Sequence, residues 1–469
     1  MKKSIIKFSA ILLLLIGAAS CDKKLNIEPR QSIGADGAIT NEEDVESAVI
    51  GAYSIMGGPE LYGTNLFMLP DLLASENYVS WRGTFQGARQ IANKTMTRDN
   101  SEASRTWIAA YKAINMANTV LNALPVVEDA DRRAALEGEA LFVRGIMHFE
   151  LVRLYALPWG ATADNSHLGV VINTKATQTE AEAFEKVPRS TVAQVYQQVI
   201  NDLTAAAAKL PEDNGTRADR FTAQAFLARV YLQQSDYARA RDAANDVIES
   251  GKYAMNASVR AVFDNKNTSE SIWEIQQNDQ NNAGTSNDGM ATFYASLPGI
   301  GRADVRMIES FVNSYPANDL RQQEWYYVGT GLRPGNLYTS KWRSFSQNLP
   351  VIRIAEMYLI RAEANLRLGT TVGDTPANDL AKVRNPLRTN LPVITNPTLQ
   401  NILQERVLEL AFEGVRIHDI KRLKETIIRY DTDGNETDRF AWNAPKLVFP
   451  IPQRDVDASA GVIVQNPGY

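Results

Sequence analysis

The only cysteine of the sequence stands where its thiol could accept a lipid. Cys21 is the single cysteine among 469 residues. A basic head precedes an unbroken apolar run over residues 11–16, and the small residues 17–20 lead directly to the thiol. This order is typical of a secretory signal peptide. The apolar run is shorter than the roughly 20 residues that span a bilayer, so it predicts an export signal.

The residues around Cys21 resemble a bacterial lipobox, in which the cysteine sulfur takes a diacylglyceryl group and becomes the new N-terminus. Ala18 stands where a lipobox more often has Leu. We therefore predict a signal peptide over 1–20, lipidation at Cys21 and a polar tether over 21–40 between the lipid and the folded body. The alternative is an ordinary secretion signal with an incidental cysteine. Without a second cysteine, an internal disulfide is excluded.

The sequence lacks the other common chemical motifs. The three histidines, His148, His167 and His418, do not assemble a zinc set. The sequence has no nucleophile elbow, Walker loop or dinucleotide loop. The stretch 431–438 superficially suggests a calcium loop, but it lacks the expected Gly and Glu, so an Asp-Gly hairpin turn is the better interpretation. We predict no catalytic residue, no metal and no cofactor.

Composition narrows the class of partner. The formal net charge is −5, and loss of the three lysines in the signal peptide would make it −8. An acidic chain is a poor ligand for nucleic acid, which needs a basic surface. The length predicts a large core in one or two interlocked domains.

Helical periodicity dominates the chain. Residues 103–124 place apolar side chains on one stripe, whereas 131–157 are apolar on more than one face, which predicts deep burial. Residues 190–210 start with Ser190 as the expected N-cap. A last long helix is expected over 398–425, with charged residues at ion-pair spacing along it.

Two stretches carry the spacing of tetratricopeptide helix pairs. Residues 218–234 and 236–250 form the first pair, and small side chains there let the helices approach closely. Residues 354–369 and 377–388 form the second pair.

Between residues 255 and 350 the helical periodicity gives way to short-strand and loop patterns. Residues 271–276 predict one short strand, and a loop rich in Asn, Asp and Gly follows at 278–289. Aromatic residues then cluster up to Trp342. Loops of this length in a compact domain are usually functional.

Three motifs together resemble one family. They are "GEALFVRGIMHFELVRLYALPWG" (138–160), "VIRIAEMYLIRAEANLRLG" (351–369) and "ERVLELAFEGVRIHDIKR" (405–422), and the closing segment 447–469 fits as well. In this order they are similar to the SusD/RagB family of glycan-binding outer-membrane lipoproteins. His418 stands where the family often has an aromatic residue.

The resemblance implies a mainly α fold: about four tetratricopeptide-like helix pairs as a scaffold, with an irregular, loop-rich insertion of short strands. It implies one domain over 41–469, with the scaffold at about 41–255 and 350–425, the insertion at about 256–349 and a C-terminal hairpin or extended segment at 426–469. It also implies a role as a non-catalytic lipoprotein, anchored in the outer membrane and facing the cell surface. Such a protein passes oligosaccharides to a SusC-type TonB-dependent transporter.

A sugar ring offers apolar C–H faces to aromatic side chains and hydroxyl edges to amides and arginine. Two loop-rich stretches supply such residues, 75–90 and 278–342. The candidate ligand contacts are Tyr78, Trp81, Arg82, Asn282, Tyr294, Trp325 and Tyr327. We expect Trp81→Ala or Trp325→Ala to weaken glycan binding without changing thermal stability, and we expect Trp107 and Trp273 to pack in the core.

The sequence leaves two other functions open. A secreted helical-barrel glycoside hydrolase or lyase would need two carboxylates across a cleft, and no pair stands apart from helical ion pairing. A tetratricopeptide scaffold that binds peptides would need a concave lining of Asn, Lys and Arg, and it would not account for the aromatic insertion.

Overall fold

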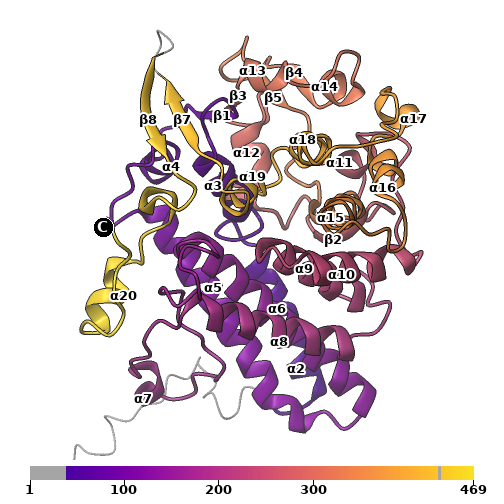
Figure 1. The fold of residues 1–469 in the computed structure, drawn as a ribbon. Helices are drawn as coiled ribbons and strands as arrows, with labels where there is room; N and C mark the ends of the chain where they lie inside the picture. The colour runs from indigo at the N-terminus through magenta and orange to yellow at the C-terminus, as the bar shows by residue number, and fades with distance from the viewer. Residues whose placement is uncertain (1–38, 431–434) are drawn as a thin grey trace, which may run out of the picture.

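The computed structural model describes residues 39–430 and 435–469. Cys21, the predicted signal peptide and the tether up to residue 38 lie outside these residues. Helices dominate the described chain, and its strands form two-stranded antiparallel sheets. The predicted fold class, a mainly α helical-repeat scaffold with a short-strand insertion, is confirmed (Figure 1).

The scaffold is a series of helices in which each packs against the next along the chain. Figure 1 shows them rising from α2 and α8, at the bottom of the view, to α15 and α16 on the right. In the described chain they can be grouped as four successive pairs: α2 (Glu42–Met56) with α5 (Ser101–Ala123), α6 (Ala130–Tyr155) with α8 (Val192–Lys209), α9 (Arg220–Gln233) with α10 (Tyr237–Glu249), and α15 (Ile354–Leu368) with α16 (Pro376–Val383).

The pair α9 and α10 shows why this sequence forms close helix pairs. Ala228 and Ala240 are fully buried and have small side chains, so the two helices can approach closely. The chain turns between them at Ser235, which adopts a left-handed φ of 59°. The side chain of Asp236 then caps α10 by accepting a hydrogen bond from the backbone of Arg239.

Helix α6 is the central helix, and its second half is buried on every side, as its sequence predicts. Its charged residues are buried because they are paired. Arg144 binds the Asp202 carboxylate through Nε at 2.9 Å and Nη2 at 2.6 Å, and Arg153 forms a bidentate pair with Glu150. His148 is also buried in α6, where its Nδ1 lies 3.0 Å from the Arg144 carbonyl oxygen and burial lowers its pKa to about 3.

Several predicted helix boundaries are wrong. The N-cap of α8 is Thr191, not Ser190, and it forms a capping box with Gln194. The expected helix over 377–388 is interrupted before Pro386, because proline cannot continue the hydrogen-bond ladder. It forms α16 and the short α17 (Pro386–Thr389).

The expected long helix over 398–425 is also two helices. They are α18 (Leu399–Glu409) and α19 (Arg416–Arg422). The break contains Phe412 with φ 63° and Gly414 with φ 73°, left-handed conformations that no α-helix contains. The charged residues of this region therefore do not form a lattice along one helix.

Arg406 pairs with Asp419 across the break at 2.9 Å, and other charged residues of this region have partners in distant segments. Glu409 accepts hydrogen bonds from Arg353 at 3.1 Å, Arg388 at 2.9 Å and Arg321 at 3.0 Å. Arg353 is fully buried and also pairs with Glu270. This network, which we call the buried ion network, joins the insertion to the C-terminal helices.

The insertion contributes most of the short strands. Residues 271–276 were predicted as a strand, and β2 (Ser271–Ile275) pairs with β6 (Leu349–Arg353). Two further sheets pair β1 (Val79–Trp81) with β3 (Val305–Met307) and β4 (Tyr326–Val328) with β5 (Leu337–Thr339). Short helices connect them: α11 (Ala261–Asp264), η3 (Ala283–Ser286), α12 (Met290–Tyr294), α13 (Glu309–Val312) and α14 (Leu320–Glu324).

The remaining elements lie around the scaffold. They are α3 (Asn65–Leu73), α4 (Gln86–Ala92), η2 (Leu124–Val126), α7 (Glu180–Ala183), η4 (Pro445–Leu447), α20 (Gln453–Ala458) and the hairpin of β7 (Ile427–Tyr430) with β8 (Glu436–Phe440). The hairpin is as predicted, although its Asp-Gly turn lies outside the described residues.

The C-terminal segment closes over one end of α6. The backbone N–H of Phe449 donates to the Leu154 carbonyl at 2.8 Å, and Asn466 Nδ2 donates to the Tyr155 carbonyl at 2.7 Å. The main hydrophobic core runs from Val45 to Ile451 and includes residues of the scaffold, the insertion and this segment. We therefore propose that residues 41–469 form one domain. No helix in the described ranges combines the length and the apolar character needed to cross a membrane.

Candidate ligand-binding site

Two small sheets form the surface that carries three of the seven expected contact residues, Trp81, Arg82 and Tyr327. Ser80 of β1 lies opposite Arg306 of β3, and Trp81 is the next residue of β1. In the second sheet, Tyr327 of β4 lies opposite Tyr338 of β5. The strands β3 and β5 contact each other, and Figure 1 shows both sheets at the same end of the molecule. Because successive side chains of a strand point to opposite faces, Ser80 and Arg306 share one face and Trp81 lies on the other.

Trp81 is half-buried at the end of β1. Its ring packs against Phe293 with a centroid distance of 5.8 Å, and Phe85 contacts the same Phe293 at 5.7 Å. The backbone at Gly83 lies so close to the Trp81 ring that no larger residue fits there without a shift. The indole is thus fixed in place while part of it stays accessible, as stacking on a ligand requires.

Arg82 is exposed, and three other arginines lie around it and around Asp304. Arg302 places its guanidinium 4.4 Å from the centroid of the Phe85 ring and pairs with Asp304 at 3.0 Å. Arg333 pairs with the other oxygen of the same carboxylate at 3.0 Å. We call Arg82, Arg302, Arg306 and Arg333 the arginine cluster.

Tyr327 is half-buried beside this cluster. Its hydroxyl oxygen accepts a hydrogen bond from the backbone of Ser296 at 2.8 Å, and the Arg343 guanidinium lies 5.5 Å from its ring centroid. The ring also contacts Tyr338 at 6.1 Å. These contacts fix Tyr327 at the rim of the surface.

Three of the expected contact residues are in the core, so the expectation that they are exposed is wrong. Tyr78 stacks on Phe412 at 5.0 Å, and its hydroxyl oxygen accepts a hydrogen bond from the Phe412 backbone at 2.6 Å. Tyr294 is fully buried, and its hydroxyl donates to Asp71 at 2.9 Å. Loop context suggested exposure, but a loop that folds back on the scaffold buries its rings.

Trp325 is the third of these residues. It is 1% exposed, and its Nε1 donates to the Val259 carbonyl at 2.8 Å. The ammonium of Lys341 lies 3.9 Å from its ring centroid. Trp107 and Trp273 are also buried, as expected.

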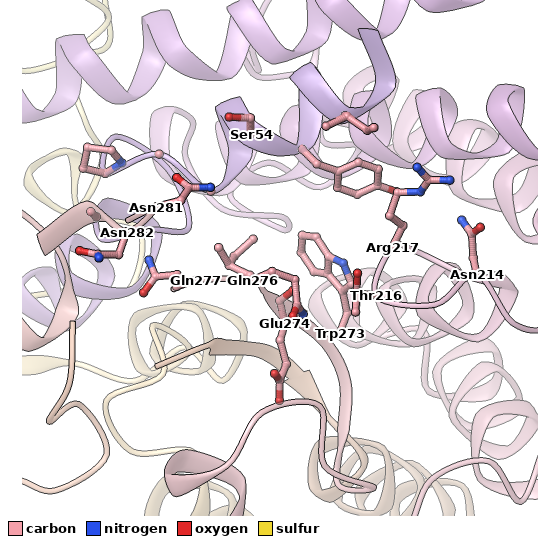
Figure 2. A pocket seen from close by; sticks show the side chains of 17 residues that line it. Ser54, Asn214, Thr216, Arg217, Trp273, Glu274, Gln276, Gln277, Asn281 and Asn282 are labelled. Carbon is pink, nitrogen blue, oxygen red and sulfur yellow. The ribbon is translucent and has the colours of Figure 1, made fainter. Parts of the chain in front are cut away.

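Asn282 lies elsewhere, in the lining of a cavity of about 650 Å³ that we call the amide pocket. Figure 2 shows Asn281 and Asn282 on one side, Asn214 and Arg217 on the other, and Trp273 between them. The lining comes from the end of α2, the loop 214–217, β2 and the loop that follows β2. Such a mixture of amides and apolar surface suits a ligand with hydroxyl groups and apolar faces.

The charged side chains that line the amide pocket already have partners within the protein. Arg217 pairs with Glu139 at 3.1 Å and with Glu46 at 3.1 Å. One oxygen of Glu274 accepts hydrogen bonds from the Asn267 backbone at 2.9 Å and from Asn348 Nδ2 at 2.8 Å. The pocket therefore offers mostly neutral donors and acceptors.

Sequence reasoning missed several residues of these two places. It did not identify Arg306, Arg333 or Phe85 as candidates, because their neighbours are distant in sequence. It also missed Asn214 and Arg217, although Asn214 and Gly215 form an Asn-Gly pair that marks a turn. The hairpins and the left-handed turns bring these residues together, and one sequence does not reveal such pairings.

In residues 39–430 and 435–469, no group of three or more His, Cys, Asp and Glu side chains is arranged to hold a metal ion. The candidate site thus consists of three parts: a fixed indole, the arginine cluster and the amide pocket.

Comparison with known families gives two matches. A family model described as "Starch-binding associating with outer membrane" matches residues 26–232, and the "SusD family" model matches residues 320–469. Among curated proteins, SusD-like protein P2 of Formosa agariphila is 26% identical over the full length of both chains. SusD-like protein P38 of the same organism is 22% identical and covers 95% of this chain and 99% of its own.

Solved structures agree. A SusD superfamily protein from Bacteroides thetaiotaomicron has a TM-score of 0.80 and 27% identity, and the match covers 91% of this chain and 100% of that one. A putative sugar binding protein from Bacteroides vulgatus has a TM-score of 0.79 and 25% identity, with 92% of this chain and 99% of that one covered.

Proposed function

The chain belongs to the SusD/RagB family, and from this premise we propose that it is a non-catalytic lipoprotein of the outer membrane that binds oligosaccharides and passes them to a SusC-type TonB-dependent transporter. The observation that carries the proposal is the fixed, half-accessible Trp81 ring next to polar and charged side chains. One surface can then hold both the apolar face and the hydroxyl edge of a sugar.

In this proposal, Trp81, Arg82 and Tyr327 contact the ligand on the surface of the two sheets, and Asn282 contacts it in the amide pocket. Tyr78, Tyr294 and Trp325 hold the framework. The pairing of Glu409 and its neighbours with arginines supports a role without catalysis, because a carboxylate fixed between guanidinium ions is a poor general acid.

Binding can be tested directly. A glycan array with the purified protein would identify ligands, and isothermal titration would measure affinity for the best one. We expect Trp81→Ala to weaken binding by about threefold to tenfold, because one ring contact is lost. Phe184→Ala is the matched control, since Phe184 is 73% exposed next to α7, at the opposite end of the view in Figure 1. Equal losses in both variants would argue against the site.

The same preparation tests the other functions. Release of reducing ends from the glycan panel would favour a hydrolase, and unsaturated products would favour a lyase. Capture of soluble peptides without any transporter would favour a peptide scaffold.

The proposed anchor rests on Cys21. Metabolic labelling with a fatty-acid probe should mark the wild-type chain and leave Cys21→Ala unmarked and released from membranes. Affinity purification of the wild type from outer membranes should recover a TonB-dependent transporter. A chain that carries no label would contradict the anchor, while the binding assay above would still stand.

A further inference from the structure

The arginine cluster carries more positive charge than its surroundings neutralise. Arg302 and Arg333 share the single carboxylate of Asp304. Neither Arg82 nor Arg306 forms an ion pair with a carboxylate of the described residues. Of these four guanidinium ions, two share one carboxylate and two have none, in a chain whose formal net charge is −5. The cluster therefore carries a local excess of positive charge, whereas the chain as a whole is negatively charged.

Arg306 is held in place by neutral oxygens. Its Nε donates to Ser80 Oγ at 3.2 Å and its Nη1 donates to Asn336 Oδ1 at 3.1 Å. Burial and the like charge of Arg82 both lower the pKa of Arg306. The positive charge of this guanidinium is therefore uncompensated, and its position is set before a ligand arrives, which reduces the entropy lost on binding.

Arg302 borders the rings that would contact a sugar, whereas Arg306 lies on the opposite face of the β1–β3 sheet from Trp81. Arg302 bonds Thr84 Oγ1 at 3.2 Å and stacks on Phe85, and Arg82 directly follows Trp81. The amide pocket differs in this respect, because its Arg217 is already paired with two glutamates. A ligand that only needed neutral hydrogen bonds would find them in the pocket and would gain nothing from the unpaired arginines.

We propose that the arginine cluster selects an anionic oligosaccharide, one whose sugar units carry carboxylate or sulfate groups. Guanidinium forks bind both groups through paired, charge-assisted hydrogen bonds, and Arg is better suited to this than Lys. The proposal rests on the proposed glycan-binding function and adds the chemical class of its ligand.

The test compares three oligosaccharides of equal length: a neutral one, one that contains uronate units and one that contains sulfate esters. Isothermal titration would use the full chain purified in a neutral detergent. At about 50 mM salt we expect the better anionic ligand to bind at least tenfold more tightly than the neutral one. At about 500 mM salt this advantage should shrink, because salt screens exposed charges. The ranking of uronate and sulfate identifies which anion the cluster prefers.

Variants locate the effect. Arg82→Gln and Arg306→Gln remove charge and keep a polar, shorter side chain, and each should weaken anionic binding by about tenfold. Neutral binding should change little in Arg306→Gln, whereas Arg82→Gln also removes a ligand contact and should weaken anionic binding more than neutral binding. Arg454→Gln is the control, because the Arg454 side chain is 67% exposed outside the cluster. A melting curve for each variant separates loss of charge from loss of fold, and the salt dependence of the wild type needs no variant at all.

The outcomes are distinguishable. Neutral and anionic ligands of equal affinity, with no salt dependence in the wild type, would overturn the selection of anions and leave glycan binding intact. Anionic binding that survives both glutamine variants would overturn the role of the cluster. Failure of every oligosaccharide to bind would instead contradict the proposed function.

Discussion

Trp81 and Trp325 illustrate how far residue type and residue role can differ. Both stand in loop-rich stretches that carry other aromatic residues, and the sequence therefore predicts that both contact the ligand. The Trp325 indole is enclosed by Phe263, Val259 and Lys341, whereas part of Trp81 reaches solvent. Enclosure by partners, rather than residue type, decides which ring a ligand can reach.

We expect Trp325→Ala to lower the free energy of unfolding by about 3–5 kcal/mol, since it leaves a large cavity and removes the hydrogen bond to Val259. Urea titration measures this loss. Trp81→Ala should cost clearly less, because its side chain is half-exposed. A Trp325→Ala protein with unchanged stability and weakened glycan binding would restore the expectation drawn from the sequence.

Asp71 gives a pH dependence. Burial raises the pKa of Asp71 to about 8, although Tyr294 donates a hydrogen bond to it. Between about pH 4 and pH 8 the folded state keeps a proton that the unfolded state has released, so stability falls as the pH rises through this window.

We expect Asp71→Asn to remove this fall. The stability advantage of the variant over the wild type should grow between pH 4 and pH 8, by at most about 1.4 kcal/mol per pH unit. Tyr294→Phe should raise the pKa of Asp71 further and extend the fall in stability to higher pH, because it removes a hydrogen bond that favours the ionised carboxyl. Unfolding curves at several pH values measure both. Parallel pH profiles for the wild type and Asp71→Asn would contradict the assignment.

At the scale of elements, the break between α18 and α19 shapes the molecule more than either helix does. The left-handed turn at Phe412 and Gly414 sends the chain back, so that Glu409 and Glu413 meet arginines and a lysine from other segments. The turn also brings Gly414 against α3, where a Cβ would lie 2.6 Å from the Leu66 carbonyl oxygen. Only glycine fits both conditions.

We expect Gly414→Ala to destabilise the protein by about 3 kcal/mol or more, from backbone strain and the clash together. Gly251→Ala is the matched control, since Gly251 has a φ of 66° and nothing within 4 Å of an added Cβ. This control adds only backbone strain, so it should lower the free energy of unfolding by about 1–2 kcal/mol. Denaturant unfolding compares the two, and similar losses would show that the contact with α3 is unimportant.

Periodicity was sufficient to predict the elements whose structure is local. The helix pair around Ser235 and the strand 271–276 follow from spacing alone, and α6 follows from its apolar faces. The interruption at Gly414 could not be predicted from spacing, because the residues that require a glycine there are in α3, more than 300 positions away in the chain. For the same reason, Trp81 and Arg82 could be identified as candidates by type, but the arginines that join them across β3 and β5 could not.

At the scale of the whole molecule, the buried ion network links segments that are far apart in sequence. Burial opposes ionisation of the Glu409 carboxyl. Three arginines nevertheless hold its pKa well below the usual value: Arg388, Arg353 and Arg321. Buried pairs of this kind specify one arrangement of segments more than they stabilise it. Removal of one partner, however, leaves the other buried charges uncompensated.

We expect Glu409→Gln to lower the free energy of unfolding by about 3–5 kcal/mol, because three buried guanidinium ions lose a shared carboxylate. Glu436→Gln removes the surface pair with Arg439 in the β7–β8 hairpin and should cost less than about 1 kcal/mol. Added salt should reduce the second effect and leave the first nearly unchanged. Equal losses would mean that the network contributes no more than a surface pair.

The closing of α6 by the C-terminal segment sets an order of events during synthesis. Asn466 bonds a residue that was added 311 positions earlier, which corresponds to roughly 15–60 s at bacterial or eukaryotic rates of translation. Until then, one end of the central helix lacks its cover. The fold can therefore close around this end of the helix only near the end of synthesis.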